Sequence, residues 1–268
     1  MNHTKEGVRE FWNANSCGEE AYLKVKDKPG YVIQASTRYA LEPYILDFAG
    51  FKDVRDLKVL EIGVGLGADH QQFAEVGADL WGIDLTERAI EHTRQRFEAF
   101  GLSSRLSVGD AENLDFTDES FDHVYSWGVL HHTPDTPKAI AEVLRVLKRG
   151  GSGSVMIYHK WSMVGLMLWV RYALLRFRPW LTLEYIYSHY LESPGTKAYS
   201  VDEAKLLFSA FSEVSIKTLL THGDLLESSA GQRHQGFLLL LARRAWPRSL
   251  IRRFLPNAGL FMLIKVRK

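Results

Sequence analysis

The stretch VLEIGVGLGADH, residues 59–70, places three glycines between an apolar run and the start of a helical pattern. The apolar run is typical of a buried strand, and ADHQQFAEVG, residues 68–77, is typical of a helix that ends at a glycine. Gly63, Gly65 and Gly67 therefore predict a tight turn whose backbone lets a ligand approach the helix N-terminus closely. The turn alone is a weak signal, because many glycine-rich turns only connect two elements.

Strands and helices alternate regularly beyond this turn. Apolar runs predict further strands at 78–85, 105–114, 121–130 and 153–159. Helical periodicity predicts helices between them, at 86–101 and 136–151. The alternation predicts a Rossmann-like, doubly wound α/β fold, whose mostly parallel sheet binds ligands at the carboxyl ends of its strands.

Two more strands complete a predicted seven-stranded sheet. A helix at 201–211 and a strand at 212–220 follow the fifth strand, and residues 259–268 are expected to form the last, antiparallel strand. The apolar run 236–242 competes for this last place, but the double arginines beyond it recur at helical spacing. We expect a single domain with these parts: an N-terminal helical cover over 1–56, a cofactor-binding core over 57–160, helical cap insertions near the active-site edge over 161–200 and 221–256, and the last strand within 257–268.

Composition limits the class of protein and its partners. The chain has 268 residues, 24% of them charged, and a net charge of +1, which gives no general attraction to nucleic acid. Cys17 is the single cysteine, so neither an internal disulfide nor a cysteine-based zinc site is expected, and we predict no metal. The N-terminus lacks an apolar core of signal-peptide length, and the apolar stretch 161–175 is too short to span a membrane, so we expect a cytoplasmic protein.

Acidic residues follow three of the predicted strands. Glu61 stands two residues before Gly63, Asp84 closes the second strand, and Asp110 follows the third together with Glu112. All of these positions lie at the edge of the sheet where ligands bind. Asp84 is placed to accept hydrogen bonds from the hydroxyls of a ribose.

These features together resemble the class I S-adenosylmethionine-dependent methyltransferases, in particular their UbiE-like, type 11 group. The pattern of that group is an acid two residues before GxGxG, an acid after the second strand, the tripeptide Asp-Ala-Glu and a fourth strand that ends in Leu-His-His, and residues 59–155 follow it. The resemblance implies a methyltransferase that uses S-adenosylmethionine on a small-molecule acceptor and releases S-adenosylhomocysteine. The acceptor atom stays open among oxygen, nitrogen, sulfur and carbon.

The same resemblance implies contacts between particular residues and the cofactor. Glu61 and the glycine turn would face its methionine part, and Asp84 its ribose. Asp110 and Ala111 would border its adenine. In this family a segment ahead of the core can fold over the cofactor, so that Tyr31 or Arg38 could reach its carboxylate. The other expected neighbours of the cofactor are Leu85, Glu112 and Trp127.

Two other functions share parts of this pattern. A nicotinamide-dependent (NAD(P)) oxidoreductase would have the same sheet, glycine turn and Asp84. It would not explain the Asp-Ala-Glu element or the end of the fourth strand. The second alternative is a non-catalytic protein of the same fold, which binds the cofactor as a sensor or serves as a membrane adaptor.

The adjacent residues His131 and His132 stand where the fourth strand would pass beside the methyl group to be transferred. On an extended segment they point in roughly opposite directions, which makes a shared metal ion unexpected. Either can border the acceptor pocket as a general base, His131 being the first choice, or can simply support the loop. Tyr158 and His159, at the end of the fifth strand, are further candidates on the same edge.

The two insertions are apolar and rich in arginine. Residues 161–190 contain three arginines and one glutamate, and residues 224–256 contain six arginines and two acids. Three interpretations stay open: a lid over an apolar acceptor, a surface for peripheral contact with an anionic membrane, or the interface of a homodimer. The protein is therefore expected to be a monomer or a homodimer.

Overall fold

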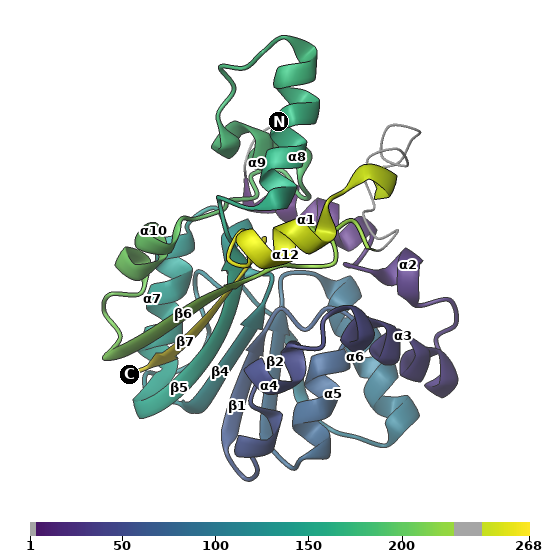
Figure 1. Ribbon diagram of the computed structural model, residues 1–268. Helices are drawn as coiled ribbons and strands as arrows, with labels where there is room; N and C mark the ends of the chain where they lie inside the picture. The colour runs from purple at the N-terminus through teal and green to yellow at the C-terminus, as the bar shows by residue number, and fades with distance from the viewer. Residues whose placement is uncertain (1–3, 228–242) are drawn as a thin grey trace.

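The computed structural model describes residues 4–227 and 243–268, which fold around one seven-stranded sheet (Figure 1). The strands lie in the order β3-β2-β1-β4-β5-β7-β6. Their bounds are β1 Lys58–Ile62, β2 Asp79–Asp84, β3 Arg105–Val108, β4 Phe121–Trp127, β5 Leu147–Tyr158, β6 Glu213–Leu219 and β7 Phe261–Arg267. Because the order reverses between β1 and β4, a crevice opens there at the carboxyl ends of the strands.

The sheet is parallel except for one strand. Strands β1 to β5 pair in parallel, and β7 runs antiparallel to both of its neighbours, β5 and β6. This confirms the predicted Rossmann-like sheet with an antiparallel last strand. Residues 261–267 supply that strand, as predicted, whereas the competing run 236–242 lies outside the described residues.

Helices cover both faces of the sheet, because successive residues of a strand point to opposite sides. Leu60 and Ile62 of β1 pack into one core with helices α7 and α10, and Val59 packs into the other core with α4, α5 and α6. Glu61 shares the second face with Val59, so a carboxyl group lies on that side of β1. The bounds of these helices are α4 Ile45–Phe48, α5 Ala68–Glu75, α6 Glu87–Phe100, α7 Thr136–Val146 and α10 Val201–Leu207.

The predicted boundary between the helix 136–151 and the fifth strand is wrong. Helix α7 ends at Val146, and Leu147 already pairs with Phe121 of β4. Gly150 has a φ of +75°, outside the helical range, and the register between β4 and β5 shifts in this region. The glycines therefore form an irregular start of β5 and not the last turn of a helix.

The fourth strand is shorter than predicted and ends at Trp127. Gly128 follows it with a φ of +73°, a left-handed conformation that glycine adopts without strain. The chain then forms a 3-10 turn over Leu130–His132. The two histidines consequently lie on a tight turn and not on an extended segment.

Further helices gather at the carboxyl end of the sheet. In Figure 1, α1 and α12 lie above this end of the sheet, and α8 and α9 rise away from it. No helix within residues 4–227 and 243–268 is long and apolar enough to cross a membrane. The bounds of the remaining elements are α1 Lys5–Ala14, α2 Glu19–Tyr22, α3 Lys28–Leu41, η1 Phe51–Asp53, α8 Met163–Tyr172, η3 Leu174–Arg176, α9 Leu183–Tyr190 and α12 Arg248–Phe254.

Candidate active site

A cavity of about 1150 Å³ lies at the carboxyl end of the sheet. Its walls come from the glycine turn, the ends of β1, β2 and β4, the loop after β3, and helices α1, α3 and α8. Sites for small molecules usually measure about 300–1000 Å³. This cavity therefore has room for two small molecules side by side.

The glycine turn has the form that the sequence predicts. Gly63, Gly65 and Gly67 have φ angles of +86°, +54° and +73°, all in the left-handed region. A Cβ atom on Gly63 would lie 2.1 Å from Cγ2 of Val129, whereas a Cβ atom on Gly65 would meet nothing within 4 Å. Gly63 is thus packed against the segment that follows β4, and Gly65 is open to the cavity.

Glu61 is buried beside His70 of α5. His70 Nδ1 lies 2.8 Å from Glu61 Oε2, and His70 Nε2 lies 2.7 Å from Ser104 Oγ, which itself donates to the carbonyl oxygen of Leu80. Since Ser104 donates its proton to Leu80, His70 Nε2 is the donor to Ser104. If His70 is neutral, its Nδ1 is an acceptor and Glu61 is the donor to it.

The pKa values agree with this assignment of protons. Burial raises the pKa of Glu61 well above its ordinary value, and burial lowers the pKa of His70 to about 3. The Glu61 carboxyl group is therefore neutral here, and a cationic ligand beside it would favour its ionised form.

Asp84 lines the cavity together with Leu85. One carboxylate oxygen of Asp84 accepts hydrogen bonds from Thr86 N and Thr86 Oγ1, at 3.0 and 2.8 Å, and the other accepts one from Gly65 N at 3.2 Å. These bonds hold the carboxylate against the glycine turn and the start of α6. A carboxylate oxygen can accept about two hydrogen bonds, so the oxygen bonded to Gly65 N retains capacity for a hydroxyl in the cavity.

The acids after β3 are closed over by the N-terminal helix α1. Lys5 Nζ lies 2.5 Å from Asp110 Oδ2 and 2.8 Å from Glu112 Oε2. Ala111 lines the cavity between these two acids. Lys5 was not among the predicted site residues, because nothing in the sequence places a lysine at the N-terminus beside a loop about a hundred residues away.

Arg38 of α3 reaches the cavity wall and is held there by Asp69 of α5. Its Nη2 and Nε lie 2.6 and 3.1 Å from the two carboxylate oxygens of Asp69, which also accepts hydrogen bonds from the hydroxyls of Tyr39 and Tyr125. The Arg38 guanidinium lies 5.8 Å from the centre of the Trp127 ring, which also lines the cavity. Asp69 is a second residue that sequence reasoning missed.

Tyr31, expected to reach the cofactor, does not line the cavity. Its side chain is fully buried in a small core with Leu23 and Leu66, and the Arg96 guanidinium lies 5.2 Å from the centre of its ring. Arg38 lies two turns after Tyr31 on the same face of α3, about 10 Å further along the helix axis, and it reaches the cavity wall that Tyr31 does not.

Only one of the two adjacent histidines lines the cavity. On their 3-10 turn the rings of His131 and His132 lie 4.2 Å apart, which corrects the expectation that they point in opposite directions. His132 lines the cavity, whereas His131 is fully buried behind it, and neither ring nitrogen of His131 has a hydrogen-bond partner in the described part of the chain. Burial lowers the pKa of His131 well below its ordinary value.

Tyr158 and His132 meet at a carboxylate that the sequence did not single out. The Tyr158 hydroxyl donates to Glu192 Oε2 at 2.7 Å, and His132 Nε2 lies 3.3 Å from the same oxygen. Glu192 lines the cavity and lies two residues beyond α9. The sequence shows Glu192 as an acid directly after the aromatic helix of the first insertion. Glu192 stands sixty residues from His132 in sequence, so only the fold brings the two side chains together.

His159 lies behind the cavity wall. Its side chain is buried, and its Nδ1 lies 3.1 Å from the carbonyl oxygen of Gly259. The structure therefore brings His132 and Tyr158 to the cavity, but not His131 and His159.

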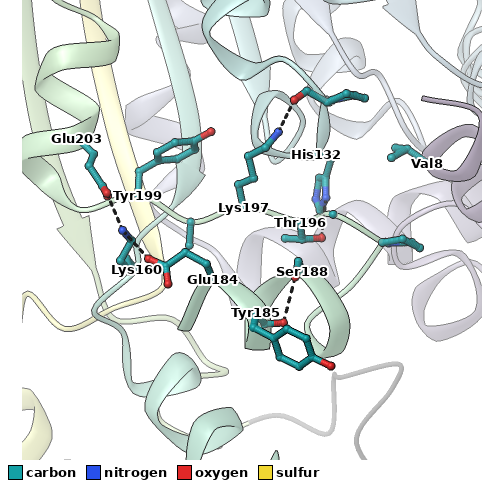
Figure 2. A pocket seen from close by; sticks show the side chains of 14 residues that line it. Val8, His132, Lys160, Glu184, Tyr185, Ser188, Thr196, Lys197, Tyr199 and Glu203 are labelled. Carbon is teal, nitrogen blue, oxygen red and sulfur yellow. Dashed lines mark hydrogen bonds and ion pairs between the residues drawn. The ribbon is translucent and has the colours of Figure 1, made fainter. Parts of the chain in front are cut away.

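A second, smaller pocket of about 490 Å³ lies on the other side of His132 (Figure 2). Its charged side chains already have partners: Lys160 pairs with Glu184 and Glu203, and Lys197 donates to the carbonyl oxygens of Thr133 and Pro134. His132 thus forms part of a wall between two hollow spaces.

Within residues 4–227 and 243–268, no group of three or more His, Cys, Asp or Glu side chains could hold a metal ion.

Comparisons with known proteins agree with this geometry. A family model described as a methyltransferase domain, of type 11, matches residues 60–155. Phosphoethanolamine N-methyltransferase 2 of Caenorhabditis elegans is 35% identical over 115 residues, which are 42% of this chain and 26% of that protein. Phosphatidylethanolamine N-methyltransferase of Cereibacter sphaeroides is 32% identical over 131 residues, which are 48% of this chain and 64% of that protein. The chain thus matches only part of the length of these curated relatives.

Solved structures show the same fold. Phosphoethanolamine N-methyltransferase 2 of Haemonchus contortus, in complex with phosphomonomethylethanolamine and S-adenosylhomocysteine, superimposes with a TM-score of 0.60 over 97% of this chain and 60% of that one, at 16% identity. At this identity the likeness concerns the fold alone. The glycine turn and the acids at the carboxyl ends of β1, β2 and β3 all lie within the matched residues. Residues 60–155 of this chain therefore match the type 11 methyltransferase-domain model, which describes the group that the sequence resembles.

Proposed function

We propose that the protein transfers a methyl group from S-adenosylmethionine to a small, apolar acceptor. One observation carries the proposal: an open glycine turn and acids from three strand ends line a single cavity, within the residues that match the methyltransferase domain. The cavity also has room for an acceptor beside the cofactor.

The residues present suit a cationic nucleoside. Gly65 leaves its side of the turn open, Asp84 has capacity for ribose hydroxyls, and the loop with Asp110 and Ala111 would border the adenine. Glu61 and Glu42 are buried at the cavity wall, and burial raises the pKa of Glu42 to about 7. A positive charge in the cavity would stabilise the ionised form of both carboxyl groups, which favours a sulfonium over a neutral ligand.

When bound, S-adenosylmethionine supplies an electrophilic methyl group on a sulfonium. The protein then has to align the acceptor, exclude water and remove a proton where the acceptor carries one. Alignment contributes up to about 7–11 kcal/mol in well-held reactants, and a positioned base about 10²–10⁴-fold.

Glu192 is the proton-accepting group at the acceptor side of the cavity. Thr196 Oγ1 donates to the carbonyl oxygen of Ser193, and Ser193 Oγ lies 2.9 Å from His132 Nδ1. Glu192, as the proton acceptor, is ionised and can only accept hydrogen bonds, so His132 carries its proton on Nε2 and donates it to Glu192. The neutral ring then accepts at Nδ1 from Ser193 Oγ. His132 and Tyr158 thus both donate to Glu192 and position its carboxylate, which takes the proton from the acceptor.

Calorimetric titration with S-adenosylhomocysteine tests cofactor binding first. We expect binding that Asp84→Asn weakens and that the exposed control Asp118→Asn leaves unchanged. Binding of a nicotinamide dinucleotide in place of S-adenosylhomocysteine would instead support the oxidoreductase.

A screen of oxygen, nitrogen, sulfur and carbon acceptors, read as release of S-adenosylhomocysteine, then tests turnover. With an active acceptor that carries a proton, we expect Glu192→Gln to slow a single turnover by about 10²-fold or more without changing the affinity for S-adenosylhomocysteine. Glu184→Gln is the matched control, because Glu184 lies in the same insertion but lines only the second pocket. Absence of release with every acceptor class would favour the non-catalytic alternative.

We also propose that the protein acts in the cytoplasm and contacts a membrane peripherally through residues 161–190 and 224–256. The described parts of both segments support this contact, because they expose large apolar side chains next to arginines: Leu174, Phe177 and Trp180 in the first, Leu250, Phe254 and Leu255 in the second.

A further inference from the structure

The hairpin formed by residues 163–190 ends in a fully exposed tip, residues 174–180 with the sequence LLRFRPW. Phe177 is 87% exposed, Trp180 73% and Leu175 62%. Phe177 also has a φ of +56°, a left-handed conformation that costs energy in a residue with a side chain. Large apolar side chains held outward at such a cost need a partner surface.

The tip is not required for the packing of the hairpin itself. The hairpin has its own small core, in which Leu168, Ala173 and Ile186 are buried with part of the Trp169 and Tyr172 side chains. Trp169 Nε1 donates to the carbonyl oxygen of Leu181, which ties the two arms together below the tip. Figure 1 shows α8 and α9 rising away from the sheet, so the tip is the outermost part of this insertion.

The charge of the tip identifies the kind of partner. Arg176 and Arg178 lie within the tip, and Arg171 lies one turn before it. Among the described residues, none of these three arginines forms a salt bridge, whereas Glu184, the one acid of the segment, pairs with Lys160 at 3.0 Å. Arg171 and Arg176 lie over the Tyr172 ring, and no described carboxylate neutralises these arginines. Aromatic and leucine side chains interleaved with such arginines match an apolar layer beneath an anionic surface, which is the composition of an anionic lipid bilayer.

The cavity opens on the same side as the tip. Leu166, Val170 and Leu175 of the hairpin line the cavity, and Leu166 and Leu175 are also 49% and 62% exposed. Leu166 and Leu175 therefore contact both the cavity and the solvent, so they lie at the opening of the cavity. An apolar molecule that leaves a bilayer at the tip would reach the cavity without crossing water.

We propose that the tip, residues 174–180, inserts into an anionic phospholipid bilayer and sets the mouth of the cavity against it, so that the acceptor is an amphiphile drawn from the lipid. The inference rests on the proposed function and names its acceptor class and partner surface. Phe177, Trp180 and Leu175 enter the apolar layer, and Arg176 and Arg178 contact the lipid phosphates and carboxylates.

Co-sedimentation of the full chain with phosphatidylcholine vesicles, with and without phosphatidylserine, tests the docking. We expect binding that requires phosphatidylserine, weakens as salt is added, and falls at least about tenfold in the variant Phe177→Ser/Trp180→Ser. Arg176→Gln/Arg178→Gln should lose the preference for phosphatidylserine. The matched controls are Leu206→Ser, an exposed leucine on α10, and Arg94→Gln on α6, and both should bind like the wild type.

Tryptophan fluorescence reports insertion directly. Vesicles that contain brominated phosphatidylcholine should quench the emission of the wild type, and Trp180→Phe should remove most of that quenching. Unchanged thermal unfolding and S-adenosylhomocysteine binding show that the variants are folded.

Several outcomes would overturn the inference. Wild type that stays in the supernatant with phosphatidylserine vesicles, or a tip variant that sediments like the wild type, excludes bilayer docking. A dimer in sedimentation velocity that the tip variant dissolves would show that a second copy covers the tip. Tip-dependent vesicle binding without any S-adenosylhomocysteine binding would leave the docking intact and refute the proposed function instead, so the two can fail separately.

Discussion

Replacing Gly63 by alanine tests how closely the glycine turn packs against the segment after β4. The new Cβ atom would lie 2.1 Å from Val129 Cγ2, in a residue whose φ is +86°. The left-handed conformation costs an ordinary residue about 1–2 kcal/mol, and overpacking in a core costs about 1–3 kcal/mol. We therefore expect Gly63→Ala to lower the free energy of unfolding by about 2–5 kcal/mol.

Gly65→Ala is the matched control in the same turn. Its φ is +54°, but its Cβ atom would meet nothing within 4 Å, so only the conformational cost of about 1–2 kcal/mol remains. That Cβ atom would point into the cavity, and we expect the affinity for S-adenosylhomocysteine to fall about tenfold or more, equal to about 1.4 kcal/mol.

Thermal unfolding and calorimetry separate the two effects. At about 2–4 °C per kcal/mol for a chain of this size, Gly63→Ala should melt roughly 4–20 °C below the wild type, and Gly65→Ala only a few degrees below. A Gly63→Ala protein that melts like the wild type would refute the close packing against Val129. A Gly65→Ala protein with wild-type affinity would refute the placement of the ligand at the open side of the turn.

Three further predictions follow from buried charges and from the acceptor side of the cavity. Asp69→Asn removes the buried carboxylate that holds the half-buried Arg38 and should destabilise the protein by about 3–5 kcal/mol in urea denaturation. Asp122→Asn, which loses a more exposed pair with Lys148, should cost about 1 kcal/mol or less. Burial lowers the pKa of His123 to about 4, below its ordinary value near 6.5, so the unfolded chain binds the proton first and stability is lost as the pH falls from about 6.5 to 4. Between pH 7 and pH 5, denaturant titration should show a loss about 2 kcal/mol larger in the wild type than in His123→Gln, and equal losses would contradict the assignment. Tyr158→Phe should slow methyl transfer, because it removes a hydrogen bond to Glu192. His131→Asn should change the unfolding midpoint more than the single-turnover rate, because His131 is buried behind the cavity. If a quench-flow experiment shows that His131→Asn slows the single turnover more than Tyr158→Phe does, His131 would be the base.

Local pattern was enough to predict the sheet, the glycine turn and the acids at the strand ends. Each depends on residues that are neighbours in sequence, and the parallel sheet brings the strand ends together without further information. The predicted end of the fourth strand, near Gly128, and the predicted end of the helix at Gly150 were wrong. The pattern of apolar and polar residues does not reveal which glycine adopts a positive φ.

The acceptor side could not be predicted, because it depends on how an insertion folds back. Glu192 reaches His132 and Tyr158 only through the path of the hairpin and the loop behind it. The sequence favours His131 over His132 as a base, whereas the structure places His132 at the cavity and buries His131 behind it, because both lie on a 3-10 turn that the sequence pattern did not predict.

The ion pairs of Lys5 with Asp110 and Glu112 tie the first helix to the loop beside Ala111, where the adenine of the proposed cofactor would lie. In the proposed function, S-adenosylhomocysteine would leave more readily once this pair of ionic contacts has opened. Because added salt weakens such contacts, the residence time of S-adenosylhomocysteine should shorten with ionic strength, and Lys5→Met should abolish that dependence in a stopped-flow displacement experiment. The pace of turnover would then be set at the N-terminus, far in sequence from the chemistry.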